Sequence, residues 1–381
     1  MNTFLKVIRL VCVILLPFLT NGQSNFQSIS LISEYGHIFS TNTFVAGTNA
    51  VGKPLSNYTA FAVNASWNFK KGSEWNEVYS NLVYGVGAYG ANFPDKKEVG
   101  VPLALYGFVQ SNITKIGLLD LRYEIDLGMA FNWRYLGISN TNNVAVSLPR
   151  TVFVDFGLML DCPISKDIIV GFGTGISHFS NGGTRRPNAG INTSTFKGSI
   201  KYSLNPYQTK TGVLPPFEPK TQVDLAIFAG YHNFQATAED LLPEELFEGV
   251  NANVAGVYAT LNRKNSRKSR FGIGLGVTYD EGLTTQVGKL NGEPFKIKKK
   301  GVENIEASAH LSYEFTVGKV SMLLQQGIYF YRRNNNILAP PQYHRLGARF
   351  NFHENLFVGA SLRAYEFKKA NFIEYTIGRR F

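Results

Sequence analysis

The segment Leu119–Trp133, LDLRYEIDLGMAFNW, alternates between two kinds of side chain along its whole length. Leu, Tyr, Ile, Met, Phe and Trp occupy one set of positions, and the other set includes Arg122, Glu124 and Asp126. Successive side chains of a β-strand point to opposite faces, so a period of two predicts a strand with one apolar face and one charged face.

The same alternation recurs later in the chain, at Ile305–Phe315 and at Leu356–Ala364. A sandwich of two packed sheets would also alternate, so the pattern alone leaves a sandwich and a barrel open. The runs are longer than the strands of about 5–6 residues that are usual in soluble sheets, and two of them end in aromatic residues, Trp133 and Phe315. Long alternating segments with aromatic ends are typical of transmembrane barrels.

The composition excludes two other classes of protein. Of 381 residues, 44% are hydrophobic, 13% are aromatic and only 17% are charged, against about 25% charged in ordinary soluble domains. Disordered chains are poor in aromatic residues and rich in charge, so disorder is excluded. After the first twenty residues, no apolar run approaches the roughly 18 residues that a membrane-spanning helix needs.

The N-terminus has the organisation of a signal peptide. Lys6 and Arg9 form a basic start, Leu10–Leu19 forms a short apolar core, and Thr20–Gln23 is small or polar. We therefore expect residues 1–22 to be removed on export. Their loss lowers the formal net charge from +11 to +9, because Lys6 and Arg9 leave and no acid does, and Cys162 then has no partner for an intrachain disulfide.

The C-terminal strand and the spacing of the turns support a barrel. Asn371–Phe381, NFIEYTIGRRF, alternates and ends in an aromatic residue, and so resembles the last strand of bacterial outer-membrane barrels. Short connections alternate with long ones, as between the two ends of such barrels. The connections at 205–220 and 368–370 fit this scheme less well, which leaves 14 or 12 strands open beside the full count of about sixteen.

We find no internal repeat and no domain linker in the sequence. The prediction is therefore one all-β domain over residues 23–381, a transmembrane antiparallel β-barrel of about 14–16 strands in the bacterial outer membrane.

Residues of the types that carry out catalysis are concentrated in one strand and the hairpin after it. The strand at 167–180 reads DIIVGFGTGISHFS and continues into NGGTRRPNAGIN. His178 and Ser180 share a face with the apolar positions, and Asn192 falls on the same face of the next strand. A base beside a hydroxyl, with a third group to orient the base, is the general arrangement of nucleophilic catalysis. A girdle of polar residues that caps a hairpin at the membrane interface is the alternative interpretation.

Two short motifs here resemble a known family. Ser177–Gly182 (SHFSNG) and Pro187–Asn192 (PNAGIN) are similar to the PagL-type lipid A 3-O-deacylases. These are outer-membrane β-barrel hydrolases with a His-x-Ser-Asn motif and a Pro-Asn-x-Gly-Ile hairpin. The resemblance covers residues 167–204. Members of the family are commonly much shorter, with eight strands, so this chain would be an enlarged relative.

The resemblance implies a role for each matching residue. Ser180 would be the nucleophile and His178 its base, while Asn181 and the backbone N–H of Gly183 would bind the oxyanion. The family places an acid after the Ile of the hairpin, where this chain has Asn192. An asparagine can accept a hydrogen bond from the imidazole and fix its tautomer, but it supplies no full charge to stabilise an imidazolium.

The nearest acids do not replace the missing carboxylate, because Asp155 and Asp167 fall on the parity that faces the lumen. Arg185 and Arg186 project from the hairpin, where guanidinium groups suit the phosphates of lipid A, although a plain solvated loop would look the same. The basic run Arg263–Arg270 is interpreted as a solvated turn rather than a nucleic-acid site. No metal or organic cofactor is implied.

The sequence therefore predicts a serine esterase that removes a 3-O-linked acyl chain from lipid A, the lipid anchor of lipopolysaccharide in the outer leaflet. The alternative is a non-catalytic barrel, a porin, transporter or scaffold, that keeps a degenerate site. The extra strands and Asn192 favour that alternative.

Overall fold

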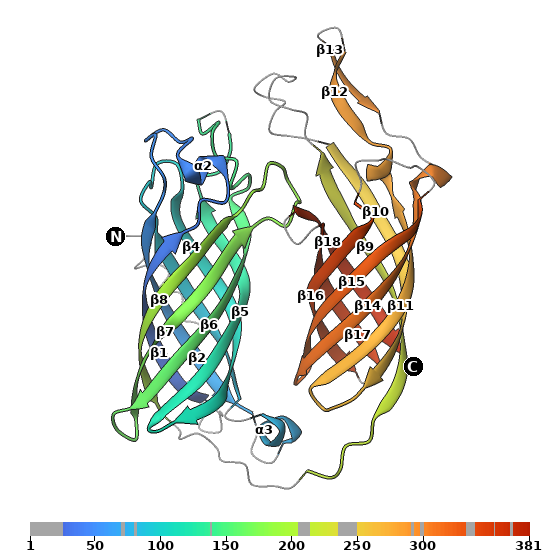
Figure 1. Ribbon diagram of the computed structural model, residues 1–381. Helices are drawn as coiled ribbons and strands as arrows, with labels where there is room; N and C mark the ends of the chain where they lie inside the picture. Colours follow the sequence, from blue (N-terminus) through green and yellow to red (C-terminus); the bar gives the residue numbers. More distant parts are fainter. Residues whose placement is uncertain are drawn as a thin grey trace. The chain divides into compact units, whose positions relative to one another are not determined.

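The computed structural model describes residues 26–69, 73–79, 82–137, 139–204, 214–234, 250–290, 293–297, 301–332, 340–353, 355–365 and 369–381. The predicted signal peptide lies outside these ranges. The described chain forms two compact units (Figure 1). The first contains the strands β1–β8, and the second contains the strands β9–β18 together with the hairpin segment Gly182–Asn188.

The first unit is a closed barrel of eight antiparallel strands. Its strands are β1 (Phe26–Ile38), β2 (Asn57–Asn68), β3 (Val83–Asn92), β4 (Gly100–Ile116), β5 (Leu119–Trp133), β6 (Arg150–Pro163), β7 (Ile168–Ser180) and β8 (Ile191–Ser203). The first and last strands close it, from Ser28 opposite Ser203 to Ile38 opposite Thr193. A short helix, α2 (Thr43–Ala46), lies in the connection after β1, and α3 (Glu74–Val78) lies in the connection after β2.

The second unit is another closed barrel of eight antiparallel strands. Its strands are β9 (Lys220–Phe234), β10 (Val250–Lys264), β11 (Ser269–Asp280), β14 (Ile305–Val317), β15 (Val320–Arg332), β16 (Gln342–His353), β17 (Leu356–Tyr365) and β18 (Lys369–Arg380). Between β11 and β14 the chain forms η1 (Glu281–Leu283), the hairpin β12 (Gln286–Leu290) and β13 (Glu293–Ile297), and η2 (Val302–Asn304). The basic run Arg263–Arg270 spans the β10–β11 turn, as the sequence predicts.

The all-β class and the antiparallel barrel architecture are confirmed, and the two barrels together have as many strands as the upper prediction. The closure differs: where the sequence predicts one barrel over 23–381, the strands close as two barrels of eight. Alternation tells which face of a strand is apolar, but it does not tell which distant strand completes the sheet. The connection at 205–220, long for a turn and containing four prolines, is the boundary between the barrels.

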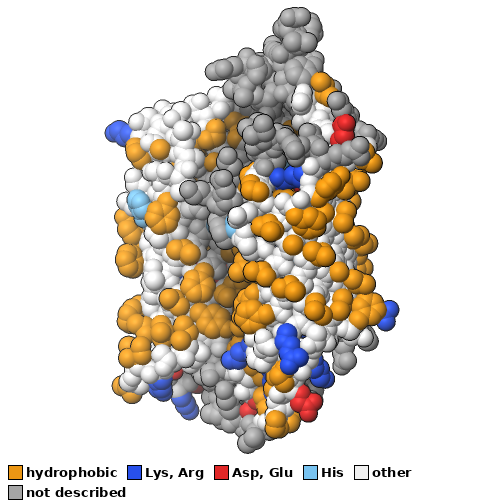
Figure 2. All heavy atoms as spheres, turned by 45° about the vertical axis from the view of Figure 1, so that its right-hand side comes forward, with side chains coloured by type: hydrophobic (Ala, Val, Ile, Leu, Met, Phe, Trp, Pro, Cys, Tyr) orange, Lys and Arg blue, Asp and Glu red, His pale blue; other side chains and the backbone are white. Residues whose placement is uncertain are grey.

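Both barrels have an apolar outer wall and ion pairs inside, and the first barrel also holds a cluster of aromatic side chains. Hydrophobic side chains are widespread on the surface in view in Figure 2. Leu31, Phe61, Phe196, Ile273 and Leu311 are each more than half exposed. Charged side chains lie inside, where Lys197 pairs with Glu34 and Asp155 in the first barrel, and Arg349 and Arg380 pair with Asp224 in the second. An apolar wall around a polar interior is the organisation of a barrel that spans a membrane. None of the helices in the described ranges is long and apolar enough to cross one.

Two local features depart from the alternating pattern. At the end of β5, Asn132 has a positive φ of 66°, and Trp133 is buried and donates its indole N–H to Thr151 Oγ1 instead of continuing the apolar outer face. After β2, residues Glu74–Val78 form the short helix α3 instead of an extended strand. Ser73 caps this helix by accepting the N–H of Asn76, a local bond that competes with extended structure.

Aromatic side chains fill the interior of the first barrel behind β7. The ring of Phe179 stacks on Phe153 with centroids 5.1 Å apart and meets Trp133 edge-on at 5.2 Å. Phe179 is fully buried, so this packing fixes the end of β7 from the inside. The two residues that flank Phe179 are held on the outer face as a consequence.

Candidate active site

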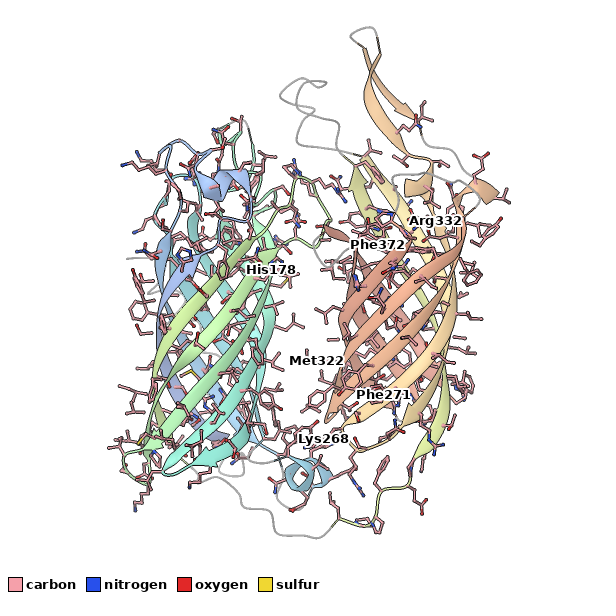
Figure 3. The ribbon with its side chains drawn as sticks, viewed as in Figure 1. His178, Lys268, Phe271, Met322, Arg332 and Phe372 are labelled. Carbon is pink, nitrogen blue, oxygen red and sulfur yellow. The ribbon has the colours of Figure 1, made fainter. Side chains whose placement is uncertain are left out.

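His178 lies near the C-terminal end of β7 (Figure 3). Ser180, two positions further on, shares its outward parity. Phe172 and Ile176, which share that parity, are 55% and 59% exposed, whereas the neighbouring Ser177 and Phe179 are 4% and 0% exposed. The alternation along β7 therefore directs both polar side chains to the outward face, as their parity predicts. At this end of the strand they are covered, since Ser180 is 5% exposed and His178 is partly buried.

Three side chains form a continuous chain of hydrogen bonds. His178 Nε2 lies 2.9 Å from Ser180 Oγ, and His178 Nδ1 lies 2.6 Å from Asn192 Oδ1. His178 and Asn192 face each other directly across β7 and β8. With the ring proton on Nδ1, that N–H donates to the amide oxygen and leaves Nε2 to accept the proton of Ser180. This is the tautomer that a general base requires.

Gly190, at the base of the hairpin, packs closely against the hydrogen-bonded side chains of His178 and Ser180. Gly190 has a φ of +73°, and a Cβ atom there would lie 3.0 Å from His178 Cε1 and 3.5 Å from the Ser180 Cβ. Glycine is the residue that adopts this conformation without strain, and its lack of a side chain leaves the space that the imidazole occupies.

Asn192 has a second partner that the sequence pattern does not indicate. Its Nδ2 donates to Thr41 Oγ1 at 3.1 Å. Thr41 lies in the connection after β1, 151 positions away, and only the closure of β1 on β8 brings the two residues together.

We call His178 and Ser180 the dyad. Asn181 and Gly183 are placed differently from these two residues. The Asn181 side chain is buried, and its Nδ2 donates to Ser147 Oγ at 2.9 Å. An oxyanion role for this amide would require it to leave that contact. Gly183 has a φ of +84° and belongs to the segment Gly182–Asn188 that groups with the second unit. The oxyanion roles of both residues stay predictions.

Arg185 and Arg186 also belong to the segment Gly182–Asn188; Arg186 is exposed and Arg185 is partly buried. Their proposed contact with phosphate stays a prediction. The predicted parity of Asp155 is confirmed, since it lies inside the first barrel, hydrogen-bonded to Ser177 and Lys197. Across the described ranges, no three His, Cys, Asp or Glu side chains are grouped to hold a metal ion.

The second barrel lacks the corresponding side chains. Its seventh and eighth strands are β17 and β18, as β7 and β8 are in the first barrel. When Gly359-Ala360-Ser361 is matched with Gly175-Ile176-Ser177, the place of His178 is taken by Leu362 and that of Ser180 by Ala364. Leu362 faces Ile373 across the strands, as His178 faces Asn192. The base, the hydroxyl and the orienting amide are all replaced by apolar side chains.

Residues 221–381 match the family described as "Acyloxyacyl hydrolase, C-terminal domain". This match confirms the predicted relation to the PagL type, but it covers the second barrel rather than the segment 167–204 that carries the recognised motifs. The region matched to a hydrolase family is thus the barrel without the dyad, and the dyad lies in the other barrel.

No curated protein matches the chain. Among solved structures, a variant of the Rh. blastica porin is 7% identical with a TM-score of 0.17, covering 93% of this chain and 98% of that chain. The toluene transporter TodX of Pseudomonas putida is 7% identical with a TM-score of 0.17, covering 94% and 89%. The siderophore receptor PiuA of Acinetobacter baumannii is 10% identical with a TM-score of 0.24, covering 88% and 56%. Similarity this weak assigns neither a pore nor a transport function to the chain.

Proposed function

Since residues 221–381 match the family described as "Acyloxyacyl hydrolase, C-terminal domain", we propose that the chain is a serine esterase of the bacterial outer membrane that removes a 3-O-linked acyl chain from lipid A. In this proposal the first barrel performs the reaction. The observation that carries it is the hydrogen-bonded chain from Ser180 through His178 to Asn192 on the outer wall.

Each side chain of the dyad has a step in this reaction. Ser180 Oγ attacks the ester carbonyl while His178 Nε2, 2.9 Å away, takes its proton. His178 then returns the proton to the departing sugar hydroxyl, which leaves the fatty acid esterified to Ser180. Water, deprotonated by the same imidazole, releases the fatty acid. Asn192 Oδ1, at 2.6 Å from Nδ1, keeps the ring in the tautomer that makes this possible.

The position of the dyad suits a lipid substrate. A site on the outer wall of a membrane barrel meets lipids that diffuse laterally, so the acyl chain would not need to leave the hydrocarbon layer. The connections 39–56, 134–149 and 181–190, of 10 to 18 residues, leave the first barrel at the end where Ser180 lies, whereas the opposite end has the short turns 117–118 and 164–167 beside the longer connection 69–82. Long connections mark the external end of a bacterial barrel, where lipopolysaccharide is found.

The alternative of a porin or transporter has less support from the first barrel. In its described part, aromatic rings and the Lys197, Glu34 and Asp155 ion pairs occupy the interior. Barrels of eight strands are generally just wide enough for side chains to fill. The second barrel, with apolar residues in place of the dyad, fits a non-catalytic role.

The proposal is tested by mass spectrometry of lipid A from cells that carry or lack the gene. We expect the lipid A of expressing cells to lose the mass of one hydroxyacyl chain. Cells that express Ser180→Ala should keep it, and cells that express Thr174→Ala, which removes another outward hydroxyl of β7, should resemble wild type. Lipid A of unchanged mass in wild-type cells, with the protein present in the outer membrane, would contradict the proposal.

Gly190→Ala should lower the deacylation rate roughly tenfold, because a strain of about 1–2 kcal/mol for an L-residue in this conformation adds to the contact with the His178 ring. The rate on purified lipid A in detergent measures this. Gly198→Ala in β8 is the matched control, since a Cβ atom there meets nothing within 4 Å. Equal losses in the two variants would mean that the close approach at Gly190 does not serve the site.

A further inference from the structure

The Asn192 side chain is held from both ends. Its oxygen accepts the hydrogen bond of His178, and its nitrogen donates to the hydroxyl of Thr41 at 3.1 Å. An amide held at one end alone would keep rotational freedom about its Cβ–Cγ bond. Two partners on opposite ends fix the plane of the group.

The segment that carries Thr41 is itself fixed to the start of β8. The N–H of Phe39 donates to the carbonyl oxygen of Asn192 at 2.9 Å, and Asn42 Nδ2 donates to the carbonyl oxygen of Gly190 at 2.9 Å. Asn42 Oδ1 also accepts the N–H of Val45 and so caps α2. We call residues 39–42 the brace, because hydrogen bonds tie them to the backbone of Gly190 and Asn192.

The brace matters because Asn192 is an amide. Either oxygen of a carboxylate can accept the imidazole N–H, whereas only one of the two ends of an amide can. When the NH₂ end turns to His178, Nδ1 must be unprotonated to accept from it. The ring proton then lies on Nε2, which can no longer take the proton of Ser180. Rotation of the amide therefore removes the base, and a group that restricts this rotation protects it.

We propose that Thr41 is a positioning residue for the esterase: its hydroxyl, delivered by the brace, holds the Asn192 amide in the plane in which its oxygen faces His178. Thr41 touches neither the substrate nor Ser180 in this proposal and acts only through Asn192. The inference rests on the proposed function, since it concerns the same site.

The test compares Thr41→Val, which keeps the shape and removes the hydroxyl, with Thr41→Ser, which keeps the hydroxyl. Loss of this hydrogen bond predicts a fall in kcat of roughly tenfold for Thr41→Val. KM should be unchanged, because Thr41 makes no contact with the substrate, and Thr41→Ser should restore most of the rate. Thr43→Val, in the first turn of α2, is the control for a general disturbance of the loop.

A double-mutant cycle with Asn192→Ala separates positioning from simple support of the fold. Because Thr41 acts through Asn192, Thr41→Val should cost nothing further once the amide is gone. Additive losses, or a wild-type kcat for Thr41→Val, would overturn the inference. Ser180→Ala is measured in the same assay: an inactive Ser180→Ala with a fully active Thr41→Val rejects the role of Thr41 alone, whereas an active Ser180→Ala rejects the esterase and this role with it.

Discussion

Ser180→Ala should reduce the deacylation of purified lipid A by at least about 10³-fold, because neither His178 nor Asn192 can replace the nucleophile. His178→Ala should cost a similar factor, since it removes the ring nitrogen that lies 2.9 Å from Ser180 Oγ and acts as its base. The two side chains form one unit, so the double variant should be no slower than either single variant.

Two controls bear on the interpretation of these losses. Thr174→Ala removes an outward hydroxyl from the same strand, which donates to the carbonyl oxygen of Thr195 at 2.8 Å, and should leave the rate near that of wild type. Heat-modifiable migration in gels should show that all variants still fold as barrels. A Ser180→Ala protein that is folded and fully active would exclude Ser180 as the nucleophile.

The second large effect concerns Asn192. Asn192→Ala should lower the rate, because the imidazole loses the partner at 2.6 Å that fixes its tautomer. Asn192→Asp should raise the rate, because a carboxylate adds charge that stabilises the imidazolium as it forms. In a serine protease, the reverse change from Asp to Asn costs about 10⁴ in kcat, and here only the direction of that effect is expected to carry over.

The geometry favours Asp over Glu as the replacement for Asn192. The oxygen of Asn192 already lies at hydrogen-bond distance from His178, and aspartate is isosteric with it, whereas glutamate adds a methylene group that the ring would have to accommodate. A second carboxylate oxygen can also accept from the hydroxyl of Thr41. With lipid A in one detergent, we therefore expect Asn192→Asp to be fastest, wild type to be intermediate and Asn192→Ala to be slowest. Equal rates for wild type and Asn192→Ala would reject the orienting role.

Sequence reasoning could predict the strands and their faces because alternation is a local property. Leu119–Phe131 and the outward parity of His178 and Ser180 follow from it directly. The closure into two barrels could not be predicted in this way, since the pairing of β1 with β8 joins segments that are distant in sequence and share no motif. The prolines between residues 205 and 220 were the available signal for a boundary.

Only the site residues that belong to the sequence motif could be predicted. His178, Ser180 and Asn192 lie within one hairpin, so spacing and parity bring them together. Thr41 lies in the connection after β1, and no sequence spacing indicates that it contacts Asn192. The contact of Asn181 with Ser147 likewise depends on the connection between β5 and β6, which local sequence does not position.

The claim that the first barrel carries the reactive serine can be tested directly, because the two barrels differ at equivalent positions. The first has His178, Ser180 and Asn192, while the second, which carries the family match, has Leu362, Ala364 and Ile373. On this account, the reactive serine lies outside the region that matches the hydrolase family.

The measurement that tests this claim most directly is mapping of a covalent adduct. The purified full-length protein is treated with a fluorophosphonate, which reacts with activated serines, and its peptides are analysed by mass spectrometry. The account predicts one dominant adduct, on Ser180, that forms in wild type and is lost in His178→Ala, with lipid A deacylation falling in step with labelling. An adduct confined to residues 221–381, or deacylation that continues after Ser180 is fully modified, would contradict it.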